Sequence, residues 1–475
     1  MAARNKKIEF GDFQTPLSLA AEVTRKISEL GIAPDVVIEP TCGIGAFVAA
    51  ASIQFPDAQV YGYELNDQHL SQLALNPSIK SNSSVSLCHA DFFATDWGVE
   101  AGKHKGKLLI LGNLPWVTSA TLGSLNSRNL PTKSNFQGHS GFDAISGKAN
   151  FDISEWMMLE LINELHGRQY DVAMLLKTAT ARKIIAHVEK SRSGLDKAAI
   201  FNIDAKKQFN ASVDACLLLL RFNGRQAEAT LEYDVFASLS NPESVRVGHR
   251  NGISIRDLAA FDKNSYMVGS SPQKWRSGVK HDASSIMELT LSENGLVNGL
   301  GEILDIEDTY LFPLMKGSDI GSGRGWRSKY VLVTQSRTGE DTTHLKIDAP
   351  KTWAYLNRHG NSLDARGSSI YKSNHRFSIF GIGEYSFLPW KVAICGLYKR
   401  LEFRLIGPNE NKPVMFDDTV CFVSFKSKKD AEDAFNKITR PSSIELMNSM
   451  IFWDEKRPIK SSMLNRIDWQ VDDTP

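Results

Sequence analysis

Apolar runs alternate with amphipathic segments along the first half of the chain, which is the pattern of a parallel sheet with helices between its strands. Helices are expected at residues 17–30, 47–53 and 150–166. The pattern therefore predicts an α/β domain with an open sheet. Short apolar runs that indicate its buried strands lie at residues 36–38, 59–63, 85–88, 108–111, 170–177, 198–203 and 213–222.

The pattern changes after Arg225, where the apolar periodicity weakens and the loops lengthen. A chain of 475 residues is also long for one domain and favours two. We expect the boundary between residues 225 and 245, and divide the chain into domains at 1–235 and 236–475. The second half shows no repeat, no low-complexity tract and no nuclease motif, so a fused restriction nuclease is not expected.

The composition is that of an ordinary globular protein, with 42% hydrophobic and 23% charged residues. No window approaches the roughly 20 apolar residues of a membrane span, and the basic start lacks the apolar core of a signal peptide. The five cysteines are scattered, without the spacing of a zinc site. These features predict a cytoplasmic protein with reduced thiols, no metal site and no membrane partner. With a net charge of +1, nucleic-acid binding would depend on local basic patches.

Polar side chains follow four successive strands of the predicted sheet at their carboxyl ends. They are Glu39, Glu64, Asp91 and Asn113. Open α/β sheets bind ligands in the crevice at this edge. Each acid alone is readily explained as a solvated turn residue, but four in sequence order are hard to explain as coincidence. The sequence therefore predicts one binding site formed by these strand ends.

The segment Glu39–Phe47 runs from the first strand through a Gly-x-Gly turn into a helix of small residues. Glycines let backbone N–H groups approach a ligand at the helix start. Val48 stands where the dinucleotide fingerprint needs its third glycine, and no Lys-Ser/Thr pair follows, so neither a dinucleotide nor a phosphate loop is indicated. The acid before the turn favours a ligand with positive charge. Glu64 is placed to bind both hydroxyls of a ribose.

The fourth strand ends in Gly-Asn-Leu-Pro-Trp, residues 112–116. An amide, a rigid proline and a large aromatic at the ligand edge suit a site that grips a flat polar group. Beside it, Asp91 can accept a hydrogen bond from an exocyclic amine, with Phe92 against a ring face. Nearer the N-terminus, Thr15 is expected to cap the helix over residues 17–30, with Pro16 at the first helical position.

In this order, the motifs resemble those of the S-adenosylmethionine-dependent amino-methyltransferases of DNA, in the gamma class, where cofactor motifs come first, catalysis next and target recognition last. The resemblance implies a Rossmann-like methyltransferase sheet with helices on both faces, followed by a C-terminal α+β domain that recognises the DNA target. It makes residues 13–16 the leading motif. Residues 113–116 match the catalytic motif Asn-Pro-Pro-Tyr/Trp, with Leu114 in place of the first proline.

The same resemblance implies a role for each matching residue. Glu64 would hold the ribose of the cofactor, and Asp91 with Phe92 its adenine. For Trp116, Phe209 and the pair Phe151–Asp152, packing in the core is an alternative explanation. The implied cofactor-binding residues are Thr15, Pro16, Glu39, Thr41, Gly43, Gly45, Phe47, Glu64, Leu65, Asp91, Phe92 and Asn113. The implied catalytic residues are Asn113, Leu114, Pro115, Trp116 and Phe209.

The chemistry of methyl transfer to a base explains why such residues are needed. The exocyclic amine of a base is a poor nucleophile because its lone pair is delocalised into the ring. The side-chain oxygen of Asn113 and the carbonyl of Leu114 can accept its two hydrogens and stabilise the positive charge that grows during transfer. The target atom is inaccessible within a duplex, so the base must be flipped out. Trp116 offers a face on which it can stack.

Basic loops in two regions suggest contacts with DNA. A long polar segment at residues 117–150 is either a lid or clamp after the catalytic strand or a flexible insertion. In the second half, a glycine-rich basic loop spans residues 316–329 and a second basic patch spans residues 358–376, each either a phosphate contact or a solvated loop. The second patch includes Arg366. The candidate DNA-binding residues are Arg128, Lys133, Lys316, Arg324, Arg327, Lys372 and Arg376.

The leading hypothesis is therefore an adenine-N6 methyltransferase that acts on a flipped adenine in double-stranded DNA, as a monomer, within a restriction–modification or host-defence system. Its cognate restriction endonuclease would be encoded separately. A cytosine-N4 methyltransferase is the nearest alternative, although asparagine at the first motif position favours adenine. Less favoured are methylation of RNA or of a protein glutamine, and a DNA-binding protein on a decayed methyltransferase fold.

Overall fold

The computed structural model describes residues 14–80, 82–117, 152–191, 193–225 and 231–472. The chain divides into two compact units, Met1–Ser254 and Ile255–Pro475. This division falls later than the boundary expected between residues 235 and 236. The reason is that β8, β9 and β10 extend the sheet of the first unit up to Ile255.

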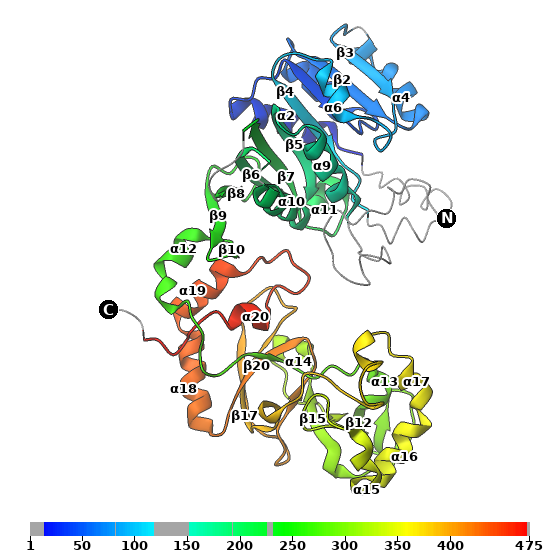
Figure 1. Ribbon diagram of the computed structural model, residues 1–475, viewed down its shortest axis with the longest axis vertical. Helices are drawn as coiled ribbons and strands as arrows, with labels where there is room; N and C mark the ends of the chain where they lie inside the picture. Colours follow the sequence, from blue (N-terminus) through cyan, green and yellow to red (C-terminus); the bar gives the residue numbers. More distant parts are fainter. Residues whose placement is uncertain (1–13, 81, 118–151, 192, 226–230, 473–475) are drawn as a thin grey trace. The chain divides into compact units, whose positions relative to one another are not determined.

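A ten-stranded sheet forms the first unit, with the order β10-β9-β8-β6-β7-β5-β4-β1-β2-β3 (Figure 1). The run from β3 to β5 is parallel, and β7 lies antiparallel between β5 and β6. The carboxyl ends of five strands therefore share one edge. The strands are β1 (Val36–Glu39), β2 (Gln59–Glu64), β3 (Val85–His89), β4 (Leu108–Asn113), β5 (Gln169–Lys177), β6 (Leu195–Ile203), β7 (Ala215–Asn223), β8 (Tyr233–Phe236), β9 (Ser244–Arg250) and β10 (Ile253–Ile255).

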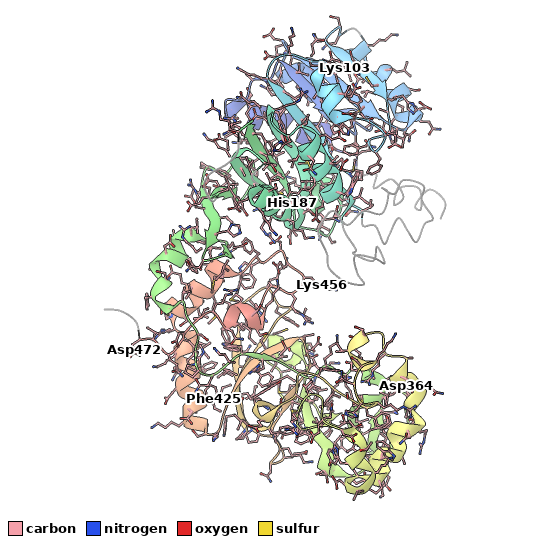
Figure 2. The ribbon with its side chains drawn as sticks, in the orientation of Figure 1. Lys103, His187, Asp364, Phe425, Lys456 and Asp472 are labelled. Atoms are coloured by element: carbon pink, nitrogen blue, oxygen red, sulfur yellow. The ribbon has the colours of Figure 1, made fainter. Side chains whose placement is uncertain are left out.

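Helices connect the parallel strands, which confirms the predicted α/β class. α2 packs against α3, whereas α9 packs against α6 and α10. The sequence pattern did not predict α10, which carries His187 (Figure 2), because it follows β5 without an intervening turn residue. The helices are α2 (Leu17–Glu29), α3 (Ala46–Gln54), α4 (Asp67–Ala74), α5 (Pro77–Lys80), α6 (Trp97–Gly102), α9 (Ile153–Glu164), α10 (Thr178–Ser191) and α11 (Ala205–Phe209).

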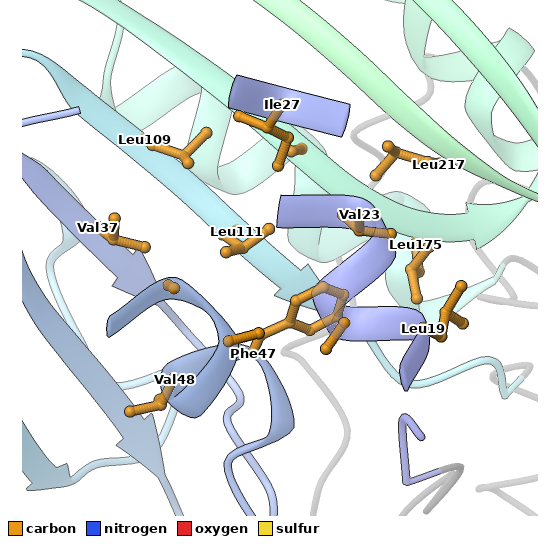
Figure 3. Close-up of a cluster of buried hydrophobic side chains, with 14 of the residues drawn as sticks. Leu19, Val23, Ile27, Val37, Phe47, Val48, Leu109, Leu111, Leu175 and Leu217 are labelled. Atoms are coloured by element: carbon orange, nitrogen blue, oxygen red, sulfur yellow. The ribbon is translucent and has the colours of Figure 1, made fainter. Parts of the chain in front are cut away.

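One hydrophobic cluster joins α2 and α3 to the central strands (Figure 3). Leu19, Val23 and Ile27 recur at helical spacing along one face of α2 and are buried against residues of β1, β4, β5 and β7. Burial of each such side chain is worth about 1.5–3 kcal/mol. Phe47 at the start of α3 is 1% exposed and lies in the same cluster. The core thus fixes both helices close to the strand ends that were expected to form the site.

The second unit contains two smaller sheets with helices around them, an α+β architecture as expected. One sheet has the order β11-β20-β17-β18 and the other β14-β13-β12-β16-β15-β19. All of their pairings are antiparallel except β15 with β19. The strands are β11 (Arg276–Ser277), β12 (Glu288–Ser292), β13 (Gly295–Asn298), β14 (Ile303–Leu304), β15 (Leu311–Met315), β16 (Lys329–Leu332), β17 (Trp390–Cys395), β18 (Phe403–Ile406), β19 (Met415–Phe416) and β20 (Val420–Phe425).

The α-helices of the second unit are mostly short. The longest, α18 and α19, pack against each other, and α19 also packs against α12. They are α12 (Leu258–Lys263), α13 (Ser284–Met287), α14 (Gly317–Ser322), α15 (Leu345–Asp348), α16 (Pro350–Arg358), α17 (Gly360–Asp364), α18 (Lys428–Thr439), α19 (Pro441–Met450) and α20 (Ser461–Leu464). Among the described residues, no helix has both the length and the apolar character needed to cross a membrane.

Candidate active site

The strand ends that the sequence singled out lie along one edge of the first sheet. β1 has β2 on one side and β4 on the other, and Glu39 pairs in register with Gly62. Asn113, the last residue of β4, pairs in register with Leu175 of β5. Because these strands are parallel, Glu39, Glu64 and Asn113 all emerge at the same edge. The sheet therefore brings together the predicted cofactor residues and the predicted catalytic asparagine.

The glycine turn between β1 and α3 needs glycine for its backbone. Gly43 has a φ of 54° and Gly45 a φ of 79°, both in the left-handed region. Gly45 is the N-cap of α3, where a Cβ would lie 2.1 Å from the Leu73 side chain. A Cβ on Gly43 would lie 2.8 Å from Oε1 of Gln14, which accepts a hydrogen bond from the Ile44 N–H at 3.1 Å. The leading motif thus covers the glycine turn.

Glu64 ties this turn to the end of β2. The Gly43 N–H donates to its Oε2 at 2.8 Å, and the Asn66 N–H donates to its Oε1 at 2.8 Å. The side chain is 14% exposed. A carboxylate has about four lone-pair directions, so each oxygen keeps room for a further donor such as a hydroxyl.

Glu39 is a buried acid that has no ion-pair partner among the residues that the structure describes. Its side chain is 3% exposed, and within the described residues Oε2 is buried with no hydrogen-bond partner. Burial raises its pKa well above the usual value, against the opposing effect of the Val48 N–H, and repulsion from Glu64 adds to the rise. An unpaired buried oxygen of this kind is costly. A ligand with a positive charge or an N–H donor would relieve that cost.

At the end of β3, Asp91 shapes the following turn, because its Oδ1 accepts the Phe93 N–H at 2.9 Å. Phe92 is 6% exposed and packs on Trp97, with their ring centroids 5.1 Å apart. The Trp97 Nε1–H also donates to the Phe92 carbonyl at 3.2 Å. Phe93 contacts Trp156 of α9, with their centroids 5.0 Å apart. An aromatic wall therefore stands beside Asp91, as a site for a flat ring requires.

The amide of Asn113 is positioned by a residue far away in the sequence. Nδ2 of Asn113 donates to the Thr15 hydroxyl at 3.3 Å. Thr15 was expected to cap α2, and this prediction is wrong. Pro16 is the N-cap, with a ψ of 136°, and its carbonyl accepts the first helical bond from Ala20. For the same reason Pro16 is not the first helical residue, and the Thr15 hydroxyl is left to contact Asn113.

The predicted catalytic motif lies against β5 and α11. Leu114 is 1% exposed, and Trp116 is 6% exposed with its Nε1–H donating to the Leu175 carbonyl at 3.4 Å. The Trp116 and Phe209 rings meet edge to face, with centroids 5.0 Å apart and planes at 67°. The two aromatics expected to contact a flipped base are thus neighbours, although Trp116 also belongs to the core cluster.

An ion pair that the sequence analysis missed supports this motif. The Ile153 N–H at the start of α9 donates to the Val117 carbonyl at 2.9 Å. Asp152 is the N-cap of α9. Its Oδ2 accepts a hydrogen bond from the Lys177 ammonium at 2.5 Å, and its Oδ1 accepts one from the Ser154 N–H at 3.2 Å. Side-chain exposure is 9% for Asp152 and 23% for Lys177. The signal available in the sequence was a lysine that directly follows the apolar run Val-Ala-Met-Leu-Leu at the end of β5.

The remaining predicted contacts are distributed as follows. Thr41 donates to the Asn113 carbonyl at 3.5 Å, whereas Leu65 is exposed and Pro115 half-buried. The buried position of Phe47 shows a packing role, and its contact with a cofactor stays a prediction. Phe13, Phe151, Arg128 and Lys133 lie outside the described residues.

The candidate DNA-binding residues of the second unit differ in whether an ion pair holds their side chains. Lys316 is paired with Glu288 at 2.8 Å. Arg327 is paired with Asp319, and Arg376 donates to both oxygens of Asp364, the α17 residue labelled in Figure 2. Arg324 and Lys372 are exposed.

Arg366, expected within the second basic patch, does not belong to an exposed surface. It is 4% exposed and donates to the carbonyls of Leu363, His281, Ser378 and Arg376. Its role is structural, because its N–H groups satisfy four backbone carbonyls inside the unit. The sequence could not distinguish it from exposed arginines, since those carbonyls belong to segments up to 85 positions away.

With this geometry established, comparison with known proteins is informative. No family model matches the sequence. The chain is 45% identical over 469 residues to the type II methyltransferase M.NspV from Nostoc sp. (strain ATCC 29411 / PCC 7524), covering 98% of this chain and 97% of that protein. It also resembles the structure of the type IIL restriction–modification enzyme MmeI in complex with DNA, at a TM-score of 0.52 and 12% identity. That likeness concerns the fold and covers 96% of this chain and 65% of MmeI.

The near full-length identity extends across both compact units, so it covers the strand-end site as well as the second unit. S-adenosylmethionine is accordingly the cofactor, and the site suits it: a buried unpaired carboxylate oxygen on Glu39 for its positive charge, a glycine turn, and Glu64 for hydroxyls. The chain belongs to the type II methyltransferases of restriction–modification systems.

Proposed function

We propose that the protein transfers a methyl group from S-adenosylmethionine to N6 of an adenine flipped out of double-stranded DNA. The observation that carries this proposal is the position of Asn113 at the end of β4, with its amide nitrogen held by Thr15 and the Trp116–Phe209 pair nearby. An amide held by its nitrogen presents its oxygen as an acceptor. That is what an exocyclic amine needs as positive charge develops on its nitrogen.

The cofactor residues follow from the same edge. Glu39 would meet the positive charge of the cofactor, the N–H groups of the glycine turn would approach it, and Glu64 would accept from the ribose hydroxyls. Asp91 and the aromatic wall around Phe92 would hold the adenine ring. When bound, the cofactor supplies an already activated methyl group. Positioning of the amine therefore accounts for most of the remaining catalysis.

Two acceptors are proposed for the target amine. The Asn113 side-chain oxygen takes one hydrogen and the Leu114 carbonyl takes the other. Because the Leu114 side chain is buried, it anchors the loop in the core and leaves the main chain to do the chemistry. The flipped base would stack on one of the paired rings of Trp116 and Phe209, a contact worth about 1–3 kcal/mol per base in single-strand binders.

The direct test is transfer of labelled methyl groups from S-adenosylmethionine to duplex DNA of mixed sequence, followed by nucleoside analysis of the product. N6-methyladenine is the expected product. N4-methylcytosine would establish the alternative target, which has the same amine chemistry. Absence of transfer to any DNA would overturn the proposal.

A variant separates binding from chemistry. Asn113→Ala should retain cofactor binding by calorimetry and lose methyl transfer by at least about a hundredfold, the scale seen when one donor or acceptor of a transition-state charge is removed. A wild-type rate in this variant would refute the role of Asn113. We further propose that the enzyme acts as a monomer in the cytoplasm, with its restriction endonuclease on a separate chain.

A further inference from the structure

Two loops far apart in the sequence meet in the second unit. The first follows α14 and runs to β16, and the second joins β17 to β18. α14 packs directly against β17 (Figure 1). Nη2 of Arg400 donates to the Gly321 carbonyl at 2.6 Å, and Nε of Arg404 donates to the Ile320 carbonyl at 3.4 Å. One arginine of the second loop and one of β18 thus donate to carbonyls at the carboxyl end of α14.

The combined surface is strongly basic, and we name it the basic face. Two carboxylates lie among its cations: Asp319 pairs with Arg327, and Glu402 pairs with both Arg400 and Arg404. Six cations against two carboxylates leave a local excess of positive charge, in a chain whose net charge is only +1. The basic face consists of Arg324, Arg327, Lys329, Lys399, Arg400 and Arg404.

Its cations are presented to solvent. Side-chain exposure is 44% for Arg327, 52% for Arg400 and 40% for Arg404. Arg324 and Lys399 are exposed, and no hydrogen bond or ion pair holds the Arg324 side chain within the part of the chain that the structure describes. Burial therefore does not explain why so many cations gather here.

The backbone of the first loop is also accessible to a ligand. Gly323 has a φ of 68° and ends α14, and a Cβ on it would lie 2.9 Å from the Arg404 guanidinium. A Cβ on Gly325 would meet nothing within 4 Å, so its backbone is accessible. The Trp326 Nε1–H donates to the Lys329 carbonyl at 2.6 Å and braces the turn. Accessible backbone between cations suits a phosphate chain.

We propose that the basic face binds the phosphate backbone of duplex DNA and supplies the main electrostatic contact of the second unit. This inference rests on the proposed function and adds the surface through which the substrate is held. Arg400 and Arg404 are already oriented by helix carbonyls and by Glu402, so little side-chain freedom is lost when a phosphate binds. Arginine retains further N–H donors for that phosphate, because it carries five.

The test uses salt. Each phosphate contact that is removed should lower the slope of log affinity against log salt by about 0.9 for duplex DNA. Arg324→Ala combined with Lys399→Ala takes one exposed cation from each loop, so the slope should fall by about 1.8. The KM for DNA should rise, while kcat at saturating DNA and the affinity for S-adenosylmethionine stay unchanged. Lys429→Ala, an exposed lysine on α18, is the matched control and should leave the slope at the wild-type value.

The outcomes are separable. Binding is measured by fluorescence anisotropy on a mixed-sequence duplex in full-length protein, with thermal melting to show that the variant is folded. A folded double variant with the wild-type slope and the wild-type KM would overturn the proposal that the basic face binds DNA. If wild-type protein binds duplex DNA with a salt slope that the double variant loses, the face is supported even if no methyl is transferred. That absence of transfer would count against the proposed function alone.

Discussion

Asn113 and Thr15, which are 98 positions apart, are joined by a hydrogen bond of 3.3 Å from the side-chain amide nitrogen to the hydroxyl. The bond links the segment before α2 to the end of β4, two elements held over the same hydrophobic cluster. It selects one orientation of the amide, with the nitrogen toward Thr15 and the oxygen directed away. The leading motif thereby contacts the residue that we propose to be catalytic.

Replacement of Thr15 by valine should therefore slow methyl transfer. Valine keeps the shape and removes the acceptor, and a hydrogen bond of this type is worth about 0.5–1.5 kcal/mol. We expect the rate constant of methyl transfer in single-turnover experiments to fall by roughly two- to twelvefold, which is that energy expressed as a rate. Thr15→Ser should restore most of the rate because it returns the hydroxyl. A Thr15→Val enzyme as fast as wild type would show that the bond does not orient the amide.

The Lys177–Asp152 pair should be important for stability. Among the described residues, loss of the lysine leaves the buried Asp152 side chain with its Ser154 contacts alone, and breaking a buried ion pair costs about 3–5 kcal/mol. Lys177→Met should lower the urea midpoint markedly, and Lys177→Met with Asp152→Asn should recover part of the loss. Additive effects of the two substitutions in this double-mutant cycle would contradict direct coupling.

Glu39 should make cofactor binding dependent on pH. Its folded pKa is raised above the usual 4.5, so above pH 4.5 the folded protein holds a proton that the unfolded chain releases. The stability of the cofactor-free protein therefore falls as pH rises through this window. A cationic ligand favours the carboxylate, so binding should release a proton and tighten with rising pH.

The corresponding variant is Glu39→Gln. It should raise the stability of the cofactor-free protein at neutral pH and weaken S-adenosylmethionine binding by about tenfold or more, since hydrogen bonds to charged groups are worth about 1.5–3 kcal/mol. Glu243→Gln, an exposed acid, serves as the control. Calorimetry in buffers of different ionisation enthalpy measures the released proton; an unchanged affinity in Glu39→Gln would be evidence against this role.

Lys391 of β17 provides a second dependence on pH. It is 1% exposed, donates to the carbonyls of Ser386 and Val414, and burial lowers its pKa from 10.5 to about 7. Between these values the unfolded chain binds the extra proton, so stability rises with pH across the window and the full penalty is present below about pH 7. Urea unfolding between pH 7 and 9.5 should show this rise in the wild type and a flatter profile in Lys391→Met. Equal slopes of the free energy of unfolding against pH in the two proteins would contradict this prediction.

The sequence was most informative about the parallel part of the sheet. Apolar runs there are flanked by breakers, so β1 to β5 were predicted with ends that differ by at most two residues from the observed ones. The polar residues at these ends converge because parallel neighbours share an edge, so the position of the site can be predicted before any contact is known. The contact between Asn113 and Thr15 could not be predicted, because a threonine before a helix also fits the role of a helix cap.

Other features depended on contacts that a local pattern does not contain. The strand β8 has four residues and joins the rest of the sheet by pairing with β6, where Ala199 lies 35 positions before its partner Asp234. Arg366 resembles any loop arginine until four carbonyls surround it. In the sequence, Lys177 is only a charged residue at the end of a strand, because its partner Asp152, the N-cap of α9, is 25 positions away. In each case the missing information was tertiary pairing rather than residue type.

The continuation of the first sheet through β9 and β10 matters for exchanging specificity between related enzymes. A junction between residues 235 and 236 would cut within β8, whose Phe236 pairs with Ser244 of β9, and would leave half of a hairpin on each parent. A junction between Ile255 and Arg256 keeps β10 whole and falls one residue after the division of the chain into compact units. Hybrid proteins joined there would inherit an intact methyl-transfer sheet from one parent and a complete recognition unit from the other.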